Sequence, residues 1–399
     1  RDKIWGSVSD AYYSFDPALE GDAGTIQRSI GTGPVQIINY LLSLSRLLVG
    51  TEAAEKSIRS SSFDEPLTPT QFTIRDSSTQ GSARVEAAKL DTRGLFVQRA
   101  KTRLFQLEYS FEVQDYISKD MNLLAPDLNE SNPIVRLAVQ RQPDTRIHCV
   151  REDGTVAVLV FEPKEEVVCW YEVETDGDVE DAIVLPGDDE DKVYYLVNRT
   201  INGSTKRYLE RFAKETECVG GTTNKNADCH LVYSGSGVTT ITGLSHLEGE
   251  TVVVWGNGKD LGTKTVASGQ ITGLSEAVTS AVVGLGYDAD WKSTKLAYGS
   301  QAGTALMQPK RVDHIAVLAR NMHYQGLKYG RGFDNLQNLP LVKDGAVMDA
   351  DTIHAAFDTQ SVELAGSWNT DSRVCLRASA PRPCQLLALA VTMATHDKF

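Results

Sequence analysis

The sequence predicts an all-β protein with a β-propeller-like core, an inserted small β-barrel and a C-terminal β region. Short apolar runs rich in β-branched and aromatic residues recur along the chain, and tight-turn dipeptides separate them. Runs of this kind, bounded by Gly, Asn and Asp, are typical of strands joined in hairpins. Long amphipathic helical periods are scarce, and the 32 glycines suit a chain with many tight turns.

Two hairpins are the clearest local elements. One apolar run leads through Asp153-Gly154 into residues 155–160, and another leads through Asn202-Gly203 into residues 206–210. Asp-Gly and Asn-Gly between β-rich runs are strong hairpin signals, because both central residues of such a turn need a positive φ. We therefore expect an antiparallel pair of strands around each dipeptide.

The apolar runs recur at a nearly constant spacing. One marker residue in each of four runs (Leu48, Phe96, His148 and Tyr194) lies 46 to 52 residues from the next. Repeats of about 40 to 50 residues with several strands each are typical of propeller blades. A four-stranded blade cannot bury both faces alone, so blades pack on their neighbours. We interpret residues 1–212 as propeller-like blades; a β-sandwich with incidental spacing is the alternative.

The character of the sequence changes near residue 213. Residues 213–307 begin with a polar loop flanked by cysteines and continue with short strand patterns and Gly turns, which favours an inserted small β-barrel. Longer strand patterns resume in residues 308–399. We expect this C-terminal β region to complete the propeller or to pack against it.

Charge and hydropathy argue against two classes of protein. The net charge is −13 and the pI is about 5.1, whereas a nucleic-acid-binding surface needs clustered Lys and Arg. An acidic wall would instead repel phosphates and let a nucleic acid slide past it. No apolar run approaches the roughly 18 residues of a membrane-spanning helix, so no membrane span is expected. Because the sequence begins at Arg1 inside an expected strand, we interpret the chain as a fragment of a longer one.

No catalytic residue, cofactor site or metal site is predicted. The seven histidines show no paired spacing, and no Gly-rich phosphate-binding motif opens an expected helix. None of the six cysteines forms a CxxC pair, which argues against zinc. The alternating acids Asp176, Asp178 and Glu180 lack the Gly and Glu that a calcium loop needs at its sixth and twelfth positions.

One disulfide is a candidate. Cys218 and Cys229 bracket a polar loop, and a bridge there would stabilise the fold by about 3 kcal/mol in the loop-entropy model. A reducing compartment would disfavour the bridge.

Several segments, taken together, resemble a known family. They are Ile4-Trp5-Gly6-Ser7, Tyr12-Tyr13-Ser14-Phe15, Leu95-Phe96-Val97-Gln98, Glu108-Tyr109-Ser110-Phe111, Ala138-Val139-Gln140, Pro143-Asp144, Asp153-Gly154-Thr155, Ile201-Asn202-Gly203, Arg207-Tyr208-Leu209-Glu210, residues 244–249 and residues 368–374. In this order the sequence resembles the tail tubular protein B, or nozzle, family of short-tailed bacteriophages and the related tail stabilisation proteins. The resemblance covers nearly the whole chain, although family members carry more sequence before Ile4.

The resemblance implies a structural component of the virion, assembled in the host cytoplasm, rather than an enzyme. Family members have a propeller-like β core with appended β domains. They form a ring, usually of six subunits, below the head–tail adaptor and around the DNA exit channel, through which DNA passes without sequence-specific binding. The segment after Tyr233 resembles the small β-barrel inserted in ubiquitin-activating enzymes, but no ubiquitin chemistry follows because no cysteine lies in this barrel after Cys229. The alternative function is a tail protein that binds or cleaves host-surface glycans.

Two stretches are candidate channel or interface loops. Asp188, Asp189, Glu190 and Asp191 form an acidic run that is either a solvated loop tip or a surface facing the DNA channel or a basic partner. His323, Tyr324, Lys328 and Arg331 mix basic and aromatic side chains, which suits contact with DNA or a neighbouring subunit; an ordinary strand-end loop is the alternative.

Overall fold

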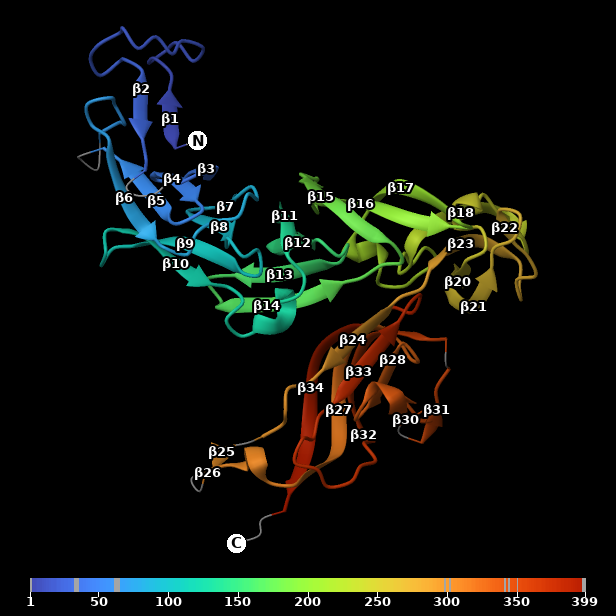
Figure 1. The fold of residues 1–399 in the computed structure, drawn as a ribbon. Coiled ribbons are helices and arrows are strands. Elements are labelled where there is room, and N and C mark those ends of the chain that lie inside the picture. Colours follow the sequence, from blue (N-terminus) through green and yellow to red (C-terminus); the bar gives the residue numbers. More distant parts are fainter. Residues whose placement is uncertain are drawn as a thin grey trace. The chain divides into compact units, whose positions relative to one another are not determined.

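In the computed structural model, the described residues fold into β-strands, turns and a few short 3-10 helices (Figure 1). The structure describes residues 2–31, 36–60, 65–297, 299–300, 303–340, 342–343, 345–349 and 351–396. The chain divides into two compact units, which are described separately: residues 1–199 with 207–212, and residues 200–206 with 213–399. No helix in these described ranges is long and apolar enough to cross a membrane.

The first unit holds antiparallel sheets that follow one another along the chain. A hairpin of β1 (Lys3–Gly6) and β2 (Ile26–Ser29) comes first. Three four-stranded sheets follow, made of β3 (Ile38–Ser43), β4 (Leu47–Thr51), β5 (Glu55–Arg59) and β6 (Thr73–Ser78); β7 (Ala88–Leu90), β8 (Arg93–Val97), β9 (Leu104–Ser110) and β10 (Asp115–Asp120); and β11 (Ile134–Gln140), β12 (Arg146–Arg151), β13 (Val156–Glu162) and β14 (Val167–Val173). The last is a three-stranded sheet of β15 (Asp178–Leu185), β16 (Lys192–Ile201) and β17 (Ser204–Arg211). In each of these sheets every strand pairs with the next in sequence.

The two predicted hairpin turns form, but by different geometries. Asn202 and Gly203 have φ angles of 48° and 72°, as a two-residue turn with two left-handed residues requires. In the other hairpin only Gly154 has a positive φ, of 83°. There the backbone N–H of Arg151 donates to the carbonyl of Thr155, so the loop has three residues and needs one left-handed position at its end.

Neighbouring sheets of the first unit bury apolar side chains against each other. Tyr40 and Leu48 of the first four-stranded sheet pack with Phe96 and Phe105 of the second. Similar cores join the second sheet to the third and the third to the three-stranded sheet. The predicted fold class is confirmed: consecutive antiparallel meanders stacked on one another, as in propeller blades.

A buried ion pair crosses between the first two four-stranded sheets. Arg46, just before β4, lies 2.8 Å from the carboxylate of Asp115 at the start of β10, and both side chains are less than a tenth exposed. Ser57 donates to the other oxygen of Asp115, and Arg46 also donates to the carbonyl of Gln114. Both charged groups are hydrogen-bonded, which offsets the free-energy cost of removing them from water. The pair also fixes the position of one sheet against the other.

We expect the Asp115→Ala substitution to lower the free energy of unfolding by about 3 to 5 kcal/mol, because it leaves the Arg46 guanidinium buried without its counter-charge. Urea denaturation followed by circular dichroism measures the change. The matched control is Asp181→Ala, which removes an exposed pair with Arg136 and should cost less than about 1 kcal/mol. Equal losses in the two variants would contradict the assignment.

The marker residue His148 is a core residue of β12. Its Nε2 lies 3.2 Å from Gln140 Oε1, which can only accept, so Nε2 carries the proton. Its Nδ1 then accepts a hydrogen bond of 2.6 Å from the hydroxyl of Tyr195. Burial, and secondly the nearby Arg146, lower the pKa of His148 from 6.5 to about 4. The neutral ring is therefore part of the folded core.

We expect the stability of the first unit to fall on acidification. Above pH 6.5 His148 is neutral in both the folded and the unfolded chain. Between pH 6.5 and about pH 4 it is protonated in the unfolded chain but stays neutral in the folded chain, so folding becomes less favourable. The full effect is about 3 kcal/mol, of which about 2 kcal/mol is lost by pH 5. Unfolding free energies at pH 7 and pH 5 for the wild type and His148→Gln measure it. The variant should lose less stability between the two pH values, and parallel profiles would exclude His148 as the source.

The second unit contains the small barrel and a sandwich. The barrel sheet has the order β18 (Asp228–Val238), β23 (Val278–Leu285), β20 (Thr251–Gly256) and β21 (Lys259–Thr265), and the pair β19 (Ile241–Thr242) and β22 (Gln270–Ile271) closes over the core. The sandwich consists of one sheet of β24 (Asp288–Lys292), β33 (Cys375–Ser379), β28 (Leu327–Gly330) and β29 (Gln337–Asn338), and a second of β32 (Ile353–Glu363), β27 (Lys310–His323) and β34 (Gln385–Thr395). Two short hairpins complete this unit: β25 (Gly299–Ser300) with β26 (Gly303–Thr304), and β30 (Val342–Lys343) with β31 (Ala346–Val347).

The end of the barrel differs from the predicted boundary at residue 307. The barrel ends with β23 at Leu285, because β24 pairs with β33 near the end of the chain. The apolar core of the sandwich lies between its own two sheets and includes Ile315, Phe357 and Leu376. A pairing over so long a stretch of chain leaves no local pattern from which the boundary could be predicted.

Candidate functional site

In the second unit, polar side chains bind the small barrel to the sandwich along a seam. Asn224, which is fully buried, donates from Nδ2 to the carbonyl of Pro381 at 2.5 Å. Its Oδ1 accepts from the backbone N–H of Gly220 at 3.2 Å. The indole N–H of the buried Trp255 donates to the carbonyl of Gly221 at 2.8 Å. One loop before the barrel is thus bound to both parts.

An arginine that follows a strand of the sandwich also binds the barrel across this seam. Arg382 follows β33, and its Nε lies 2.8 Å from the carboxylate of Asp260 on β21. Its Nη1 donates to the carbonyl of Gln325 at 3.0 Å. Asp260 is only 10% exposed, so this pair is far better protected from solvent than an ordinary surface ion pair. It connects the barrel to two loops of the sandwich.

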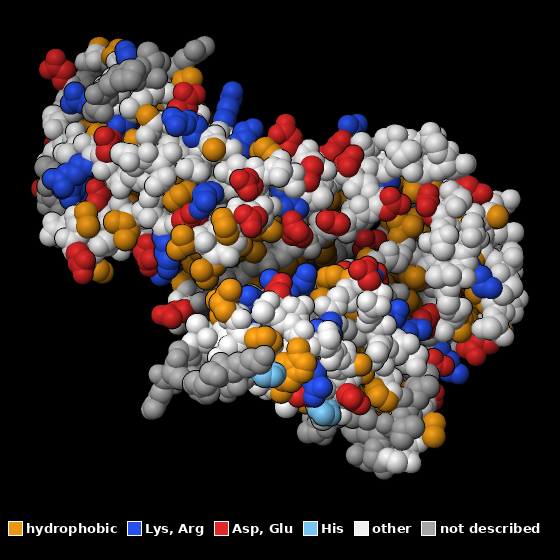
Figure 2. Space-filling view, turned by 60° about the horizontal axis from the view of Figure 1, so that its bottom comes forward, with side chains coloured by type: hydrophobic (Ala, Val, Ile, Leu, Met, Phe, Trp, Pro, Cys, Tyr) orange, Lys and Arg blue, Asp and Glu red, His pale blue; other side chains and the backbone are white. Residues whose placement is uncertain are grey.

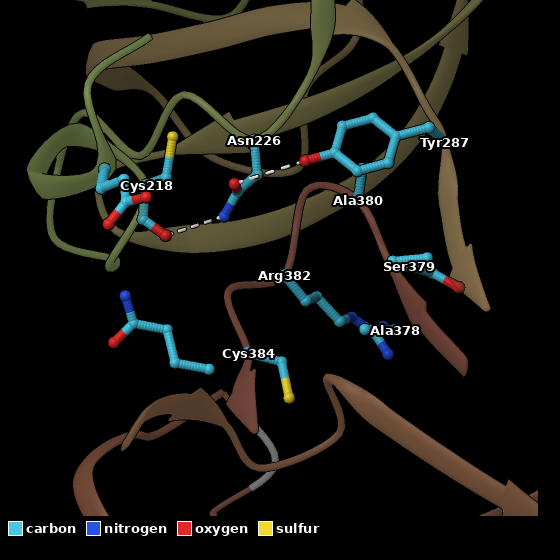
Figure 3. Close-up of a pocket in the computed structure, with 11 residues that line it drawn as sticks. Cys218, Asn226, Tyr287, Ala378, Ser379, Ala380, Arg382 and Cys384 are labelled. Atoms are coloured by element: carbon cyan, nitrogen blue, oxygen red, sulfur yellow. Dashed lines mark hydrogen bonds between the residues drawn. The ribbon is translucent and has the colours of Figure 1, made fainter. Parts of the chain in front are cut away.

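Two small hollows flank the turn that carries Arg382. The first, of about 200 Å³, is shown in Figure 3. There the Tyr287 hydroxyl donates to Asn226, and the Asn226 amide donates to the carbonyl of Cys218. The second hollow, of about 190 Å³, is lined by Asp260, Gln325, Gly326, Lys328, Ser379, Ala380 and Arg382. Arg382, which binds Asp260 across the seam, lines both of them.

His323 lies inside the seam rather than on its surface. Its Nδ1 accepts from the backbone N–H of Gln325 at 3.2 Å, so the proton of the neutral ring is on Nε2. Nε2 is buried without a hydrogen bond and lies 3.7 Å from a carboxylate oxygen of Asp351. The ring stands edge to face with Trp255 at 6.2 Å. Burial and then Arg382 lower the pKa of His323, while nearby carboxylates oppose this shift.

The second candidate loop, which contains His323, Tyr324, Lys328 and Arg331, is therefore not an exposed surface. His323 and Tyr324 are 1% and 0% exposed, and the Tyr324 hydroxyl donates to the carbonyl of Pro340. Lys328 on β28 lines the second hollow, and Arg331 donates to the carbonyl of Ser367 at 2.9 Å. The structure brings His323 and Lys328 to the seam and leaves Arg331 outside it. Tyr324 is buried because it packs in the sandwich core, and His323 is buried in the seam against Trp255.

The acidic run lies in the loop between β15 and β16. Asp191 accepts from the backbone N–H groups of Arg141 and Gln142 at 2.7 and 3.0 Å, so this carboxylate has a structural role. Glu190 donates its backbone N–H to Asp189 at 3.0 Å. Asp188 and Asp189 are exposed, while Glu190 and Asp191 are half-buried. Contact of this loop with a channel or a basic partner stays a prediction.

The predicted disulfide between Cys218 and Cys229 is not formed; both side chains are half-buried thiols. Hydrogen bonds close the loop instead. The backbone N–H of Lys225 donates to the carbonyl of Glu217 at 2.8 Å, and the Lys225 ammonium lies 2.6 Å from the Glu217 carboxylate. Within the described ranges, no cluster of three or more His, Cys, Asp or Glu side chains is arranged to hold a metal ion.

Comparison with known proteins adds little. No family model matches the chain, and no curated protein matches it. One solved structure that it resembles is a sialidase of Trypanosoma rangeli, at 9% sequence identity, covering 95% of this chain and 93% of that one. The TM-score of 0.23 is too low for that resemblance to carry any argument.

The residues that hold the seam were not among the predicted site residues. Asn224 lies in a polar loop like many others, and Asp260 and Arg382 are separated by 122 positions in sequence. The one available signal was Trp255, a large apolar side chain at the end of a strand pattern with an N–H that needs a partner when buried.

We expect Asn224→Ala to loosen the seam, because the buried carbonyl of Pro381 and the N–H of Gly220 lose their partner. The cost should be about 1 to 3 kcal/mol for the second unit. Hydrogen exchange at the backbone of residues 220–226 and 251–256 measures the loosening. Asn338→Ala, on the exposed strand β29, is the control and should leave exchange unchanged. Unchanged protection in Asn224→Ala would show that the barrel is held by its apolar contacts alone.

Proposed function

We propose that the chain is a structural subunit of the tail of a short-tailed bacteriophage. In this proposal it belongs to a nozzle ring around the DNA exit channel, below the head–tail adaptor. The supporting observation is that consecutive stacked sheets carry buried arginines, each paired with a carboxylate. A ring that guides a long polyanion under pressure needs walls that keep their shape, and such interlocked sheets supply them.

Three arginines show how this stiffness arises. Arg46 joins two sheets through Asp115. Arg151 at the end of β12 lies 2.7 Å from the carboxylate of Glu172 on β14, and Arg199 on β16 lies 2.6 Å from that of Glu210 on β17. The last two side chains are at most 2% exposed and also donate to backbone carbonyls. Arg46 thus joins two sheets, whereas Arg151 and Arg199 each add a buried ion pair between strands of one sheet.

The segments that carry the family resemblance have architectural roles. Leu95 and Phe96 are core residues of β8, and Asn202-Gly203 forms the β16–β17 turn. Arg207 lies 2.6 Å from Glu180 across the sheet, and Glu210 holds Arg199. Side chains of these kinds maintain a fold and give no sign of a reaction centre, which supports a structural role.

The charge of the chain supports passage of DNA without retention. Its net charge is −13, and in Figure 2 acidic and basic side chains are interspersed over the face shown. Phosphate contacts depend on clustered Lys and Arg, so such a surface would offer a sliding polyanion few places to bind. In a ring of identical copies the contacts between neighbours are head-to-tail, and closure sets the number of subunits.

We expect rings in negatively stained electron micrographs when this chain is expressed with the adaptor of the same tail. The control is the chain expressed without the adaptor, which should give no such rings. A chain that stays separate from the adaptor under all conditions would contradict the proposal.

A second measurement separates this function from the glycan-directed alternative. Incubation with host-surface polysaccharide should release no reducing ends, whereas a glycan-cleaving protein would release them steadily. Turnover by the folded chain that disappears on heating would favour the alternative function.

A further inference from the structure

Strand β34 is an unusual edge. It pairs with β27 on one side and is the last strand of its sheet among the described strands (Figure 1). From Gln385 to Thr395 it has no charged residue, no proline and no glycine. Leu386 and Leu387 are 37% and 53% exposed, and Ala388, Ala390 and Thr392 are exposed as well.

The other long edges of the molecule are protected. Among the described strands, every sheet edge longer than six residues other than β34 carries a charge: Arg136 on β11, Glu172 on β14, Asp178 on β15, Arg207 on β17, Asp228 on β18, Asp260 on β21 and Glu363 on β32. Charged side chains on an edge discourage pairing with another chain, because the added strand would crowd the charge and remove part of its hydration. The edge of β34 lacks this protection and is a ready surface for strand addition.

The middle of β34 is regular enough to act as a template. The pairing of β34 with β27 is irregular at two places. At Leu387 the extra residue is on β34, and next to Met393 the extra residue is on β27. Between them, Ala388 to Thr392 pair without interruption with Leu318 to His314. Leu389 and Val391 point into the sandwich core, whereas Ala388, Ala390 and Thr392 stand on the outer face. The centre of this regular segment is Ala390.

We propose that β34 pairs with β34 of a second copy of this chain, antiparallel, about a two-fold axis at Ala390. This register places Ala388 opposite Thr392 and Ala390 opposite itself on the outer face. On the inner face it places Leu389 opposite Val391. Small residues meet small ones and apolar residues meet apolar ones, and no charge is buried, so the segment is complementary to itself. The two three-stranded sheets become one sheet of six strands.

A second copy is the favoured occupant because its edge matches in charge, length and residue size. A partner strand with a charged residue opposite Leu389 or Val391 would have to bury that charge against the sandwich core. The inference does not rest on the proposed function. Two-fold contacts cannot join neighbours within a head-to-tail ring. If the chain also forms such a ring, the β34 pair is a separate state of the chain.

Sedimentation equilibrium of the intact chain at rising concentration tests the pairing. The wild type should pass from monomer to dimer. Ala390→Lys should weaken dimerisation about fivefold or more, because like charges lie directly opposite each other across the axis. The matched control is His314→Lys, which adds a lysine to the outer face of the central strand β27 and should dimerise like the wild type.

Cross-linking tests the register. Ala390→Cys should form a disulfide-linked dimer under mild oxidation, because the two thiols face each other across the axis, and the wild-type cysteines should give no such species. A chain that stays monomeric at all concentrations, a dimer unaffected by Ala390→Lys, or a dimer without the Ala390→Cys cross-link would each overturn the proposal. None of these outcomes depends on whether rings form with the adaptor, so the two proposals fail separately.

Discussion

The second and third sheets of the first unit each have two apolar faces that need cover, and the stacking of that unit depends on that constraint. A four-stranded antiparallel meander with apolar residues on both faces cannot be stable alone in water. Leu48 and Phe96 are buried between one pair of sheets, and Val150 and Val197 between another. Stacking is therefore cumulative, because each sheet is completed by the next. The sandwich of the second unit meets the same need with its own two sheets.

Buried polar groups fix the placement of two stacked sheets through Arg46 and hold strands within a sheet through Arg151 and Arg199. Apolar contacts between sheets tolerate small rotations, whereas a buried guanidinium requires its acceptors in fixed positions. Arg46, Arg151 and Arg199 each bind a carboxylate and at least one backbone carbonyl or hydroxyl. The seam of the second unit follows the same principle with an amide, since Asn224 satisfies groups on both sides.

The polar groups that were candidates for chemistry mostly serve this structural purpose. Asp191 binds two backbone N–H groups, His323 is buried against Trp255, and Arg331 donates to the carbonyl of Ser367. Two surface features of the described residues are the exposed carboxylates Asp188 and Asp189 and the uncharged edge of β34. Both are suited to contacts with other molecules, which agrees with a protein that acts by assembly.

The sequence alone determined the strands, the turns and the roughly 50-residue repeat, because these depend on side-chain alternation and on backbone preferences of a few adjacent residues. It also identified His148 and Phe96 as core positions through the repeat. Only the tertiary structure decided that β24 joins β33, that His323 and Tyr324 are buried, and that Asn224 meets Pro381. Such contacts join residues far apart in the chain, and the summed packing of whole sheets selects them, which no local pattern records.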